Sequence, residues 1–159
     1  ERKKVNVSDS IKKKYNEEKA CFVTLTENSR LRGCIGNLQA RQELWKDVVD
    51  NAINAGFNDP RFLPLTSEEI DKIKIEISVL SKPEELKFSD EKDLLDKIDK
   101  EMGIILKKGF YSATFLPQVW KEIFSKKEFL EQLCLKAGLD KNSWKDSEIC
   151  FYRVEKVNE

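Results

Sequence analysis

Several short stretches of the chain alternate apolar with polar residues, which is the pattern of β-strands that bury one face. The strands predicted from this pattern cover residues 21–26, 31–35, 73–80, 103–107, 110–116 and 148–157. The turn-forming residues 27–30 join the first two strands into a hairpin, which places Arg32 and Cys34 on one face of its second strand. A second hairpin is predicted around Lys108 and Gly109.

Other stretches place apolar residues at the three- and four-residue spacing of helices that bury one stripe. The longest covers residues 41–57, and shorter helices are predicted to begin near residues 66, 90, 117 and 125. Residues 1–19 form a polar lead-in that is also expected to be helical. Residues 66–69 and 125–128 have capping-box spacing, in which a hydroxyl and a carboxylate three residues later bind free backbone N–H groups.

The segment that follows the predicted helix at 41–57 combines turn residues with large apolar side chains. Residues 58–60 are expected to end the helix, because the residue before a proline is pushed out of the α region. The apolar side chains expected to anchor this loop in the core are Phe57, Phe62 and Leu63.

Helices and strands are mixed along the chain, but the hairpins recur without the regular strand–helix alternation of a parallel sheet. We therefore predict an α+β fold with mainly antiparallel sheets flanked by helices. A length of 159 residues is enough for one domain with a sizeable core, and 36% charged residues predict a well-solvated surface.

The charge balance argues against bulk electrostatic binding to nucleic acid. Twenty-nine basic residues face twenty-nine acidic ones, so the formal net charge is zero. A local basic cluster near the N-terminus is interpreted as a solvated face rather than a nucleic-acid site. Its members are Lys3, Lys4, Lys12, Lys13, Lys14 and Lys19.

The chain contains no histidine, which removes Ser-His-Asp triads, Cys-His dyads and histidine-ligated metals. Its four cysteines are too scattered for a structural zinc site, so we expect no metal and no cofactor in this chain. No stretch approaches the roughly 20 apolar residues of a membrane span. With no signal peptide in these residues, we expect a cytoplasmic protein with reduced thiols.

The most distinctive stretch is residues 31–36, in which two glycines flank a cysteine that follows an arginine. Glycine allows positive φ or a close approach of two backbones. A guanidinium near a thiol favours the thiolate. The stretch can therefore be a reactive turn, a small anion cradle or a bulged strand, and the residues alone leave all three open.

The order of motifs along the chain resembles that of the AMMECR-one domain family, whose bacterial members include protein A of the AmmeMemoRadiSam system. The matching motifs are Phe22-Val23-Thr24-Leu25, Leu31-Arg32-Gly33-Cys34-Ile35-Gly36, Asp59-Pro60-Arg61-Phe62, Pro64-Leu65-Thr66, residues 75–81, Pro83-Glu84, residues 113–120, Lys136-Ala137-Gly138-Leu139 and Trp144. They run from about residue 20 to residue 155, whereas residues 1–19 match poorly.

The resemblance implies a two-lobed α+β fold. Residues 1–19 would be a lead-in, and residues 20–159 a single domain with a larger lobe from both chain ends and a smaller lobe inserted between. It also implies a cytoplasmic protein whose partners are a Memo-like protein and a radical-SAM protein. It implies no single agreed reaction.

Covalent chemistry is one hypothesis for the site. Cys34 would be the nucleophile, and without histidine the base would have to be a carboxylate, either Asp59 or Glu76. The alternative is that the thiol is buried and inert, as free cysteines often are, and that Glu76 faces solvent.

Anion binding is the other hypothesis. Arg32 and Arg61 would hold a phosphate or carboxylate, since the planar guanidinium matches both groups. Gly33 and Gly36 would expose backbone N–H groups beside them. The alternative is that Arg61 pins its loop by pairing with a nearby carboxylate, either Asp59 or Asp50.

We therefore predict a protein that binds a small anionic or phosphate-bearing ligand, such as a nucleotide, in a cleft between its lobes. Thr114 and Gln118 would line the same cleft, or would simply be a strand residue and a first-turn helix residue. An enzyme that acts with the Memo-like and radical-SAM partners is one form of this hypothesis. A non-catalytic scaffold that docks onto them is the other.

Overall fold

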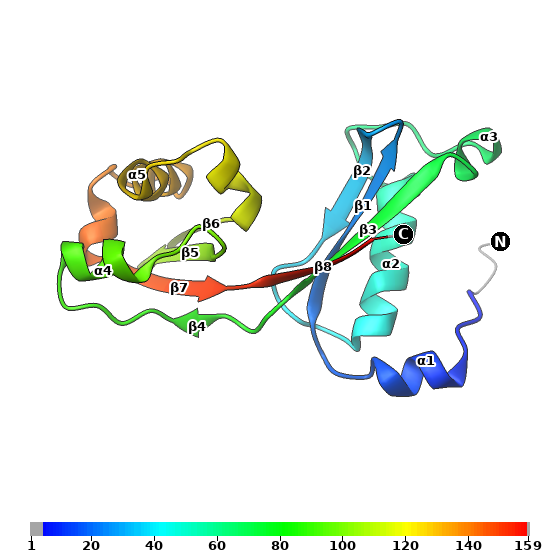
Figure 1. Ribbon diagram of the computed structural model, residues 1–159, viewed down its shortest axis with the longest axis horizontal. Helices are drawn as coiled ribbons and strands as arrows, with labels where there is room; N and C mark the ends of the chain where they lie inside the picture. The colour runs from blue at the N-terminus through cyan, green and yellow to red at the C-terminus, as the bar shows by residue number, and fades with distance from the viewer. Residues whose placement is uncertain (1–4, 159) are drawn as a thin grey trace. The chain divides into compact units, whose positions relative to one another are not determined.

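The computed structural model describes residues 5–158, and the chain divides into two compact units. Among the described residues, the first unit contains residues 5–81 and 155–158, and the second contains residues 82–154. Each unit is built on one four-stranded sheet with its own helices (Figure 1). Both sheets are antiparallel, which confirms the predicted α+β class.

The first sheet has the strand order β2-β1-β3-β8, so β2 and β8 are its edges. Its strands are β1 (Ala20–Glu27), β2 (Arg30–Gly36), β3 (Ile73–Leu80) and β8 (Val154–Asn158). The predicted first hairpin is confirmed, because β1 and β2 pair antiparallel. Asn28 and Ser29 at its turn have φ values of 50° and 64°. Two consecutive residues with positive φ suit the twist of a tight hairpin.

Helix α2 (Leu44–Phe57) covers one face of this sheet. Its length follows the predicted apolar stripe, although it begins at Leu44 rather than at residue 41. Cys21, Val23 and Leu25 of β1 are buried against Ala55 of the helix. The partly buried side chains around them are Ile35, Leu44, Val48, Ala52, Leu65, Ile73, Ile75 and Ile77.

The N-terminal lead-in contains a helix, but only α1 (Asp9–Lys14) is helical. The residues after it turn toward α2 and complete its first turn. The N–H groups of Leu44 and Trp45 donate to the carbonyl oxygens of Glu17 and Tyr15 at 2.9 and 3.1 Å. These bonds satisfy donors that a helix start otherwise leaves free. Of the predicted basic cluster, Lys3 and Lys4 lie outside the described residues.

The loop between α2 and β3 does not reach the core in the way its apolar residues predict. Phe57 is 48% exposed and Leu63 is 83% exposed, so the prediction that they anchor the loop is wrong. Polar contacts of Asp59 and the packing of Leu65 near Gly56 hold the loop instead. The predicted capping box is confirmed, and it opens α3 (Ser67–Ile70).

The second sheet has the strand order β4-β7-β5-β6. Its strands are β4 (Glu84–Glu85), β5 (Gly103–Lys108), β6 (Tyr111–Phe115) and β7 (Glu148–Tyr152). The helices of this unit are α4 (Glu91–Lys97), α5 (Lys126–Lys136) and two 3-10 turns, η1 (Pro117–Lys121) and η2 (Ser143–Asp146). The predicted β5–β6 hairpin is confirmed. The single strand predicted for residues 148–157 is instead two strands, because Arg153 separates β7 from β8 and they join different sheets.

The second unit has its own core between its sheet and helices. Trp120 of η1 stacks on Phe129 of α5 with ring centres 3.6 Å apart, and its Nε1–H donates to the Met102 carbonyl at 2.9 Å. The Tyr152 ring lies over Gly103 of the neighbouring strand, where any Cβ would collide with it. Other fully buried residues are Leu94, Ile98, Ile104, Leu106, Leu130, Leu133, Cys134, Trp144 and Ile149.

Candidate functional site

The distinctive residues 31–36 lie in the edge strand β2. Cys34 faces Thr24 of β1, and its Sγ lies 3.2 Å from Thr24 Oγ1. Both side chains lie on the face opposite α2, because they alternate with the residues that α2 covers. The pairing register shifts between Leu25 and Thr26. The register shift agrees with the interpretation of this stretch as a bulged strand, and the reactive and anion-binding interpretations stay predictions.

Asp59 and Arg61 hold the backbone of Cys34 from the outer side of β2. The Cys34 N–H donates to Asp59 Oδ2 at 2.9 Å, and Arg61 Nη2 donates to the Cys34 carbonyl at 3.2 Å. The same guanidinium donates to both carboxylate oxygens of Asp59, at 3.0 Å from Nε and 2.7 Å from Nη2. The structure therefore shows the alternative in which Arg61 pairs with Asp59.

This environment favours the charged form of Asp59. The side chain is only 2% exposed, yet the hydrogen bond from Arg61 holds the pKa of Asp59 far below its ordinary value. The N–H groups of Cys34 and Arg61 act in the same direction. A carboxylate with so low a pKa is a weak base at neutral pH. Its contacts position the backbone of Cys34, and a role for Asp59 as the base stays a prediction.

Arg32 forms a two-bond ion pair with Glu69 of α3. Arg32 Nε donates to Glu69 Oε1 at 2.6 Å, and Nη2 donates to Oε2 at 3.1 Å. The hydrogen bond from this guanidinium lowers the pKa of Glu69 to about 2, and the pair raises the pKa of Arg32. The capping box fixes the carboxylate, since Glu69 Oε2 also accepts the Thr66 N–H at 2.8 Å. Arg32 Nη1 is buried and has no hydrogen-bond partner among residues 5–158.

Phe62 brings the two predicted anion-binding arginines together. The guanidinium carbons of Arg32 and Arg61 lie 5.9 and 5.5 Å from the centre of its ring. Both distances fall within the range of cation–π attraction. We call these residues the Arg32–Phe62–Arg61 cluster. Each of its guanidinium groups carries its own carboxylate partner, Glu69 or Asp59.

Gly33 and Gly36 allow close packing of β2. A Cβ on Gly33 would collide with the Ala55 carbonyl of α2, and a Cβ on Gly36 would collide with the Phe22 ring. Neither glycine has a positive φ. Their surroundings therefore show a packing role in an extended strand, and their part in anion binding stays a prediction.

Glu76 lies one strand further along the same face as Cys34. It faces Thr24 across β1 and β3, and its Oε1 lies 3.1 Å from Lys156 Nζ of β8. The Glu76 side chain is 33% exposed. Cys34, Thr24 and Glu76 thus form a row of thiol, hydroxyl and carboxylate across three strands.

Thr114 and Gln118 belong to the second unit. Thr114 Oγ1 donates to the Ile104 carbonyl at 2.8 Å and lies 3.2 Å from the Tyr152 hydroxyl. Gln118 is exposed in η1. These positions match the interpretation of the two residues as a strand residue and a helix-start residue. The cleft between lobes stays a prediction.

Asp47 lies in a buried polar network that the sequence did not predict, because the sequence shows it only as a polar position on a helix. Asp47 is 2% exposed and lies in the first turn of α2, where the helix dipole favours a negative charge. Its Oδ2 accepts the Cys21 N–H at 3.2 Å and Asn51 Nδ2 at 3.0 Å, and its Oδ1 accepts Asn37 Nδ2 at 3.0 Å. Burial raises the pKa of the adjacent Cys21 thiol to about 12. The network ties β1 and the segment before α2 to the helix.

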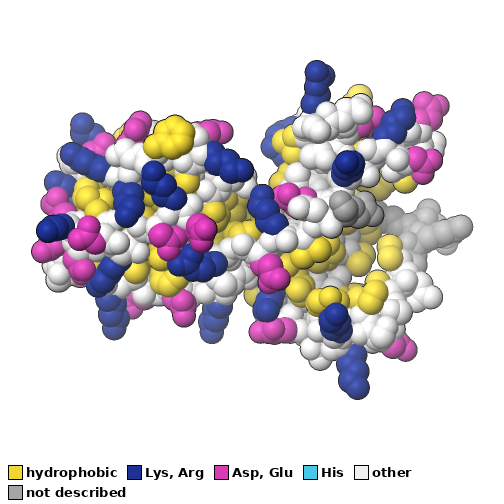
Figure 2. Space-filling view, in the orientation of Figure 1, with side chains coloured by type: hydrophobic (Ala, Val, Ile, Leu, Met, Phe, Trp, Pro, Cys, Tyr) yellow, Lys and Arg dark blue, Asp and Glu magenta, His cyan; other side chains and the backbone are white. Residues whose placement is uncertain are grey.

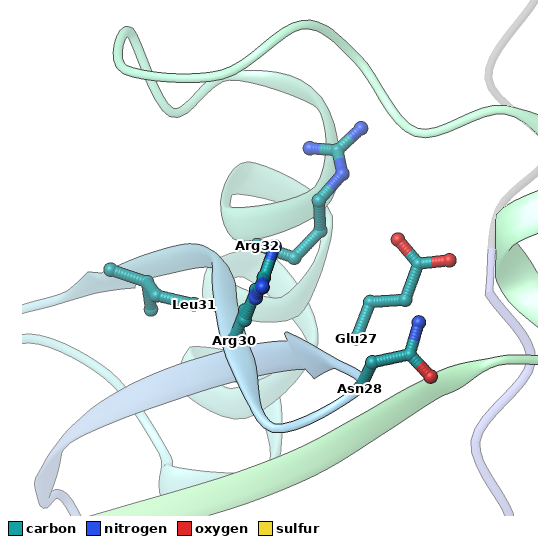
Figure 3. A pocket seen from close by; sticks show the side chains of 5 residues that line it. All are labelled: Glu27, Asn28, Arg30, Leu31 and Arg32. Carbon is teal, nitrogen blue, oxygen red and sulfur yellow. The ribbon is translucent and has the colours of Figure 1, made fainter.

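A pocket beside the β1–β2 turn was also missed by sequence reasoning. It has a volume of about 520 Å³ and is lined by Glu27, Asn28, Arg30, Leu31 and Arg32. Figure 3 shows the Glu27 carboxylate and the Arg32 guanidinium projecting to the same side of the hairpin. The turn residues that predicted the hairpin thus also bring charges of both signs around one opening.

The surface carries both signs of charge. On the face shown in Figure 2, Lys and Arg side chains are interspersed with Asp and Glu side chains over each unit. Within residues 5–158, no group of His, Cys, Asp and Glu side chains is arranged to hold a metal ion. No helix in this range is long and apolar enough to cross a membrane.

Comparison with known proteins decides the family. The sequence profile of AMMECR1 matches residues 1–157. The chain belongs to the AMMECR1 family. This confirms the resemblance, and the match extends it to the N-terminal residues, which carry none of the matching motifs.

Other AMMECR1-like chains align over almost the whole sequence. Identity is 43% over 156 residues with a protein of Aquifex aeolicus, covering 96% of this chain and 80% of that protein. It is 40% over 158 residues with protein NEQ441 of Nanoarchaeum equitans, covering 98% and 88%. The crystal structure of the uncharacterized protein PH0010 from Pyrococcus horikoshii has a TM-score of 0.81 at 33% identity, covering 99% of this chain and 81% of that one. The AMMECR1 fold of this chain is therefore shared with a solved structure.

Proposed function

We propose that the first unit binds a small anionic ligand, a carboxylate or a phosphate group, at the Arg32–Phe62–Arg61 cluster. The observation that carries this proposal is Arg32 Nη1, which is shielded from water and meets no acceptor within residues 5–158. A buried donor without an acceptor destabilises a folded protein by about 1–3 kcal/mol. A ligand oxygen that reaches Nη1 removes this penalty and forms a charge-assisted hydrogen bond.

Arg61 supports the same proposal from the other side of the cluster. Its side chain is 55% exposed, and its contacts to Asp59 and Cys34 use only Nε and Nη2. Nη1 makes no hydrogen bond to any described residue. Two guanidinium groups that each keep one amino group without a hydrogen-bond partner suit the several oxygens of a phosphate or carboxylate.

The neutralising carboxylates determine how such a ligand is recognised. Because Glu69 and Asp59 balance the two guanidinium charges, the cluster attracts an anion through directed hydrogen bonds more than through net charge. Affinity is therefore expected to fall less with salt than binding to an unpaired basic patch does.

Titration of the ¹⁵N-labelled full chain with inorganic phosphate and with acetate tests this proposal. Saturable NMR shifts are expected at the amides of residues 31–36 and 59–62. Arg32→Lys keeps the positive charge but loses the planar fork, so it is expected to weaken binding about five-fold, equivalent to about 1 kcal/mol.

The matched control is Arg41→Ala, which removes an exposed arginine that forms no side-chain hydrogen bond or ion pair with residues 5–158. It should bind phosphate and acetate like the unmodified chain. No saturable shift with either anion, or equal binding by the Arg32→Lys variant, would contradict the proposal.

A catalytic form of this function would add covalent chemistry at Cys34. The observation that favours it is the fixed thiol, whose backbone is held by Asp59 and Arg61 and whose Sγ contacts Thr24. All four cysteines are unpaired, which suits the reducing cytoplasm that we propose as its location. Native-state alkylation should modify Cys34 first, and Cys34→Ser should remove that fast phase. A thiol at position 34 that reacts only after unfolding contradicts the catalytic form.

A docking role is the second candidate. Leu63 and Ile70 of the first unit are 83% and 58% exposed, which leaves apolar surface that a partner would cover. We propose the Memo-like and radical-SAM proteins as these partners. Sedimentation of purified mixtures should show complex formation that Leu63→Ser weakens, whereas unchanged sedimentation of both mixtures rules this role out.

A further inference from the structure

The pocket at the β1–β2 turn carries a carboxylate that the protein itself does not use. Glu27 lines the pocket, and its side chain forms no hydrogen bond or ion pair with any residue of the described chain. Glu27 lies close enough to Arg32 to raise the pKa of the guanidinium. The carboxylate is therefore available to a ligand while it remains near the positive charge.

Arg32 lines the same pocket and is held in one orientation. Its Nε and Nη2 edge is bound to Glu69, and its guanidinium lies against the Phe62 ring. An arginine fixed by a bidentate partner loses little further freedom when it binds a second acceptor. Arg30 adds a second positive side chain to the lining, and Leu31 adds an apolar one.

The lining of the pocket combines charged groups of both signs. Arg30 and Arg32 give the lining positive charge, and Glu27 gives it an unpaired carboxylate (Figure 3). A simple anion would satisfy the arginines but would be repelled by Glu27. A ligand that carries an ammonium group as well as an acid group satisfies both parts.

We propose that the pocket at the β1–β2 turn binds a zwitterionic ligand, with its carboxylate or phosphate at Arg32 and its ammonium group at Glu27. The ligand class is that of amino acids, aminoalkyl phosphates and peptide ends. This inference rests on the proposed anion binding by Arg32, and it adds a requirement for a cation in the same molecule.

Three probes of similar length separate the two requirements. Propionate carries only the acid group, propylamine carries only the amine, and β-alanine carries both. In NMR titrations of the full chain, β-alanine is expected to bind about ten-fold more tightly than propionate, equivalent to about 1.4 kcal/mol. Propylamine is expected to bind more weakly than β-alanine. β-Alanine should add shifts at residues 27–30 to those that propionate causes at residues 31–36 and 59–62.

Glu27→Gln is the decisive variant, because it removes the carboxylate charge and keeps the shape of the side chain. It should reduce β-alanine binding to the level of propionate and leave propionate binding unchanged or stronger. Glu68→Gln is the matched control, since Glu68 is exposed on the neighbouring α3 and does not line the pocket. Thermal unfolding of both variants checks that they fold, and Glu27→Asp provides a second variant in which the advantage of β-alanine should shrink.

The outcomes separate this inference from the proposed function. If neither propionate nor phosphate binds, anion recognition at Arg32 fails and the zwitterion inference fails with it. If propionate binds and β-alanine binds no better, only the zwitterion inference is overturned. If β-alanine binds better but Glu27→Gln keeps that advantage, the assigned role of Glu27 is overturned.

Discussion

At the scale of single residues, the charged side chains of the candidate site form ion pairs with one another. Arg61 pairs with Asp59, and Arg32 pairs with Glu69. Each carboxylate also accepts a backbone N–H group, Asp59 that of Cys34 and Glu69 that of Thr66. Loss of either negative charge therefore breaks an ion pair and a main-chain contact together.

Glu69 makes stability depend on acid pH. Its pKa is lowered to about 2 in the folded chain, from an ordinary value of about 4.3. A lowered folded pKa means that the stabilising contribution is complete above the unfolded value and is lost as pH falls toward 2. We expect the urea midpoint to drop between about pH 5 and pH 3, and to drop less in Glu69→Gln. An unchanged acid dependence in this variant, measured beside Glu68→Gln, would assign the effect to other carboxylates.

Asp47 is expected to be the most sensitive carboxylate of the first core. Asp47→Asn places an amide where backbone and side-chain donors of Cys21 and Asn51 need an acceptor. We expect a loss of about 2–3 kcal/mol in the free energy of unfolding, measured by urea denaturation. Asp50→Asn on the same helix is the control, because that side chain is exposed and accepts only from Gln42. Equal losses in the two variants would contradict the role of the buried network.

At the scale of elements, the sequence predicts structure that depends on residues close together in the chain. It misses contacts between residues that are far apart in the chain. The apolar stripe of α2, the alternation of β3 and the capping boxes involve residues a few positions apart, so the period alone reveals them. The bond between Cys34 and Asp59 spans 25 positions, and that between Arg32 and Glu69 spans 37. No local pattern encodes either contact, and the ligand-binding role expected of Arg32 and Arg61 stays a prediction.

The loop before α3 shows that the sequence can also predict burial that the structure does not have. Apolar residues such as Leu63 predict burial, but burial depends on whether the neighbouring elements leave space beneath the loop. Leu65 is the residue of this loop that packs against the core beside Gly56, whereas Leu63 remains exposed. Composition gives the preference of a side chain, and the tertiary neighbours decide whether it is satisfied.

The contact of β2 with α2 depends on the absence of a side chain at position 33. Gly33→Ala would drive a Cβ into the Ala55 carbonyl, and a backbone atom of a helix cannot move aside as a side-chain end can. We expect a destabilisation of about 1–3 kcal/mol by chemical denaturation. Gly56→Ala is the comparison, since the closest atom to its new Cβ would be the end of the flexible Leu65 side chain, and it should change stability much less. Similar losses would show that the close contact is not the cause.

At the scale of the whole molecule, the chain forms two separate hydrophobic cores. The chain leaves the first unit after Ser81 and re-enters it at Glu155 as the strand beside β3. The core around Leu94, Trp120 and Phe129 shares no residue with the core around Cys21 and Ala55. The second unit is therefore an insertion between two adjacent strands of the first.

This arrangement predicts that the first unit folds without the second. Replacing residues 82–153 by a short Gly-Asn turn should give a protein with dispersed NMR signals and cooperative unfolding, because β3 and β8 would then form a hairpin. Full-length protein serves as the reference for the chemical shifts of residues in α2. An unfolded product would show that the first core needs the inserted unit.

The hydrogen bonds that join Asp59 and Arg61 to the Cys34 backbone affect whether copies of this protein aggregate at high concentration. The outer side of an edge strand offers the N–H and C=O groups with which another chain can align and start an aggregate. At Cys34 the N–H already donates to the Asp59 carboxylate, and the C=O already accepts from the Arg61 guanidinium. An incoming strand therefore cannot form its hydrogen bonds at this central position of β2. Asp59→Ala would unmask that edge, and ordered, thioflavin-positive assemblies should then form at neutral pH while the unaltered protein stays dispersed.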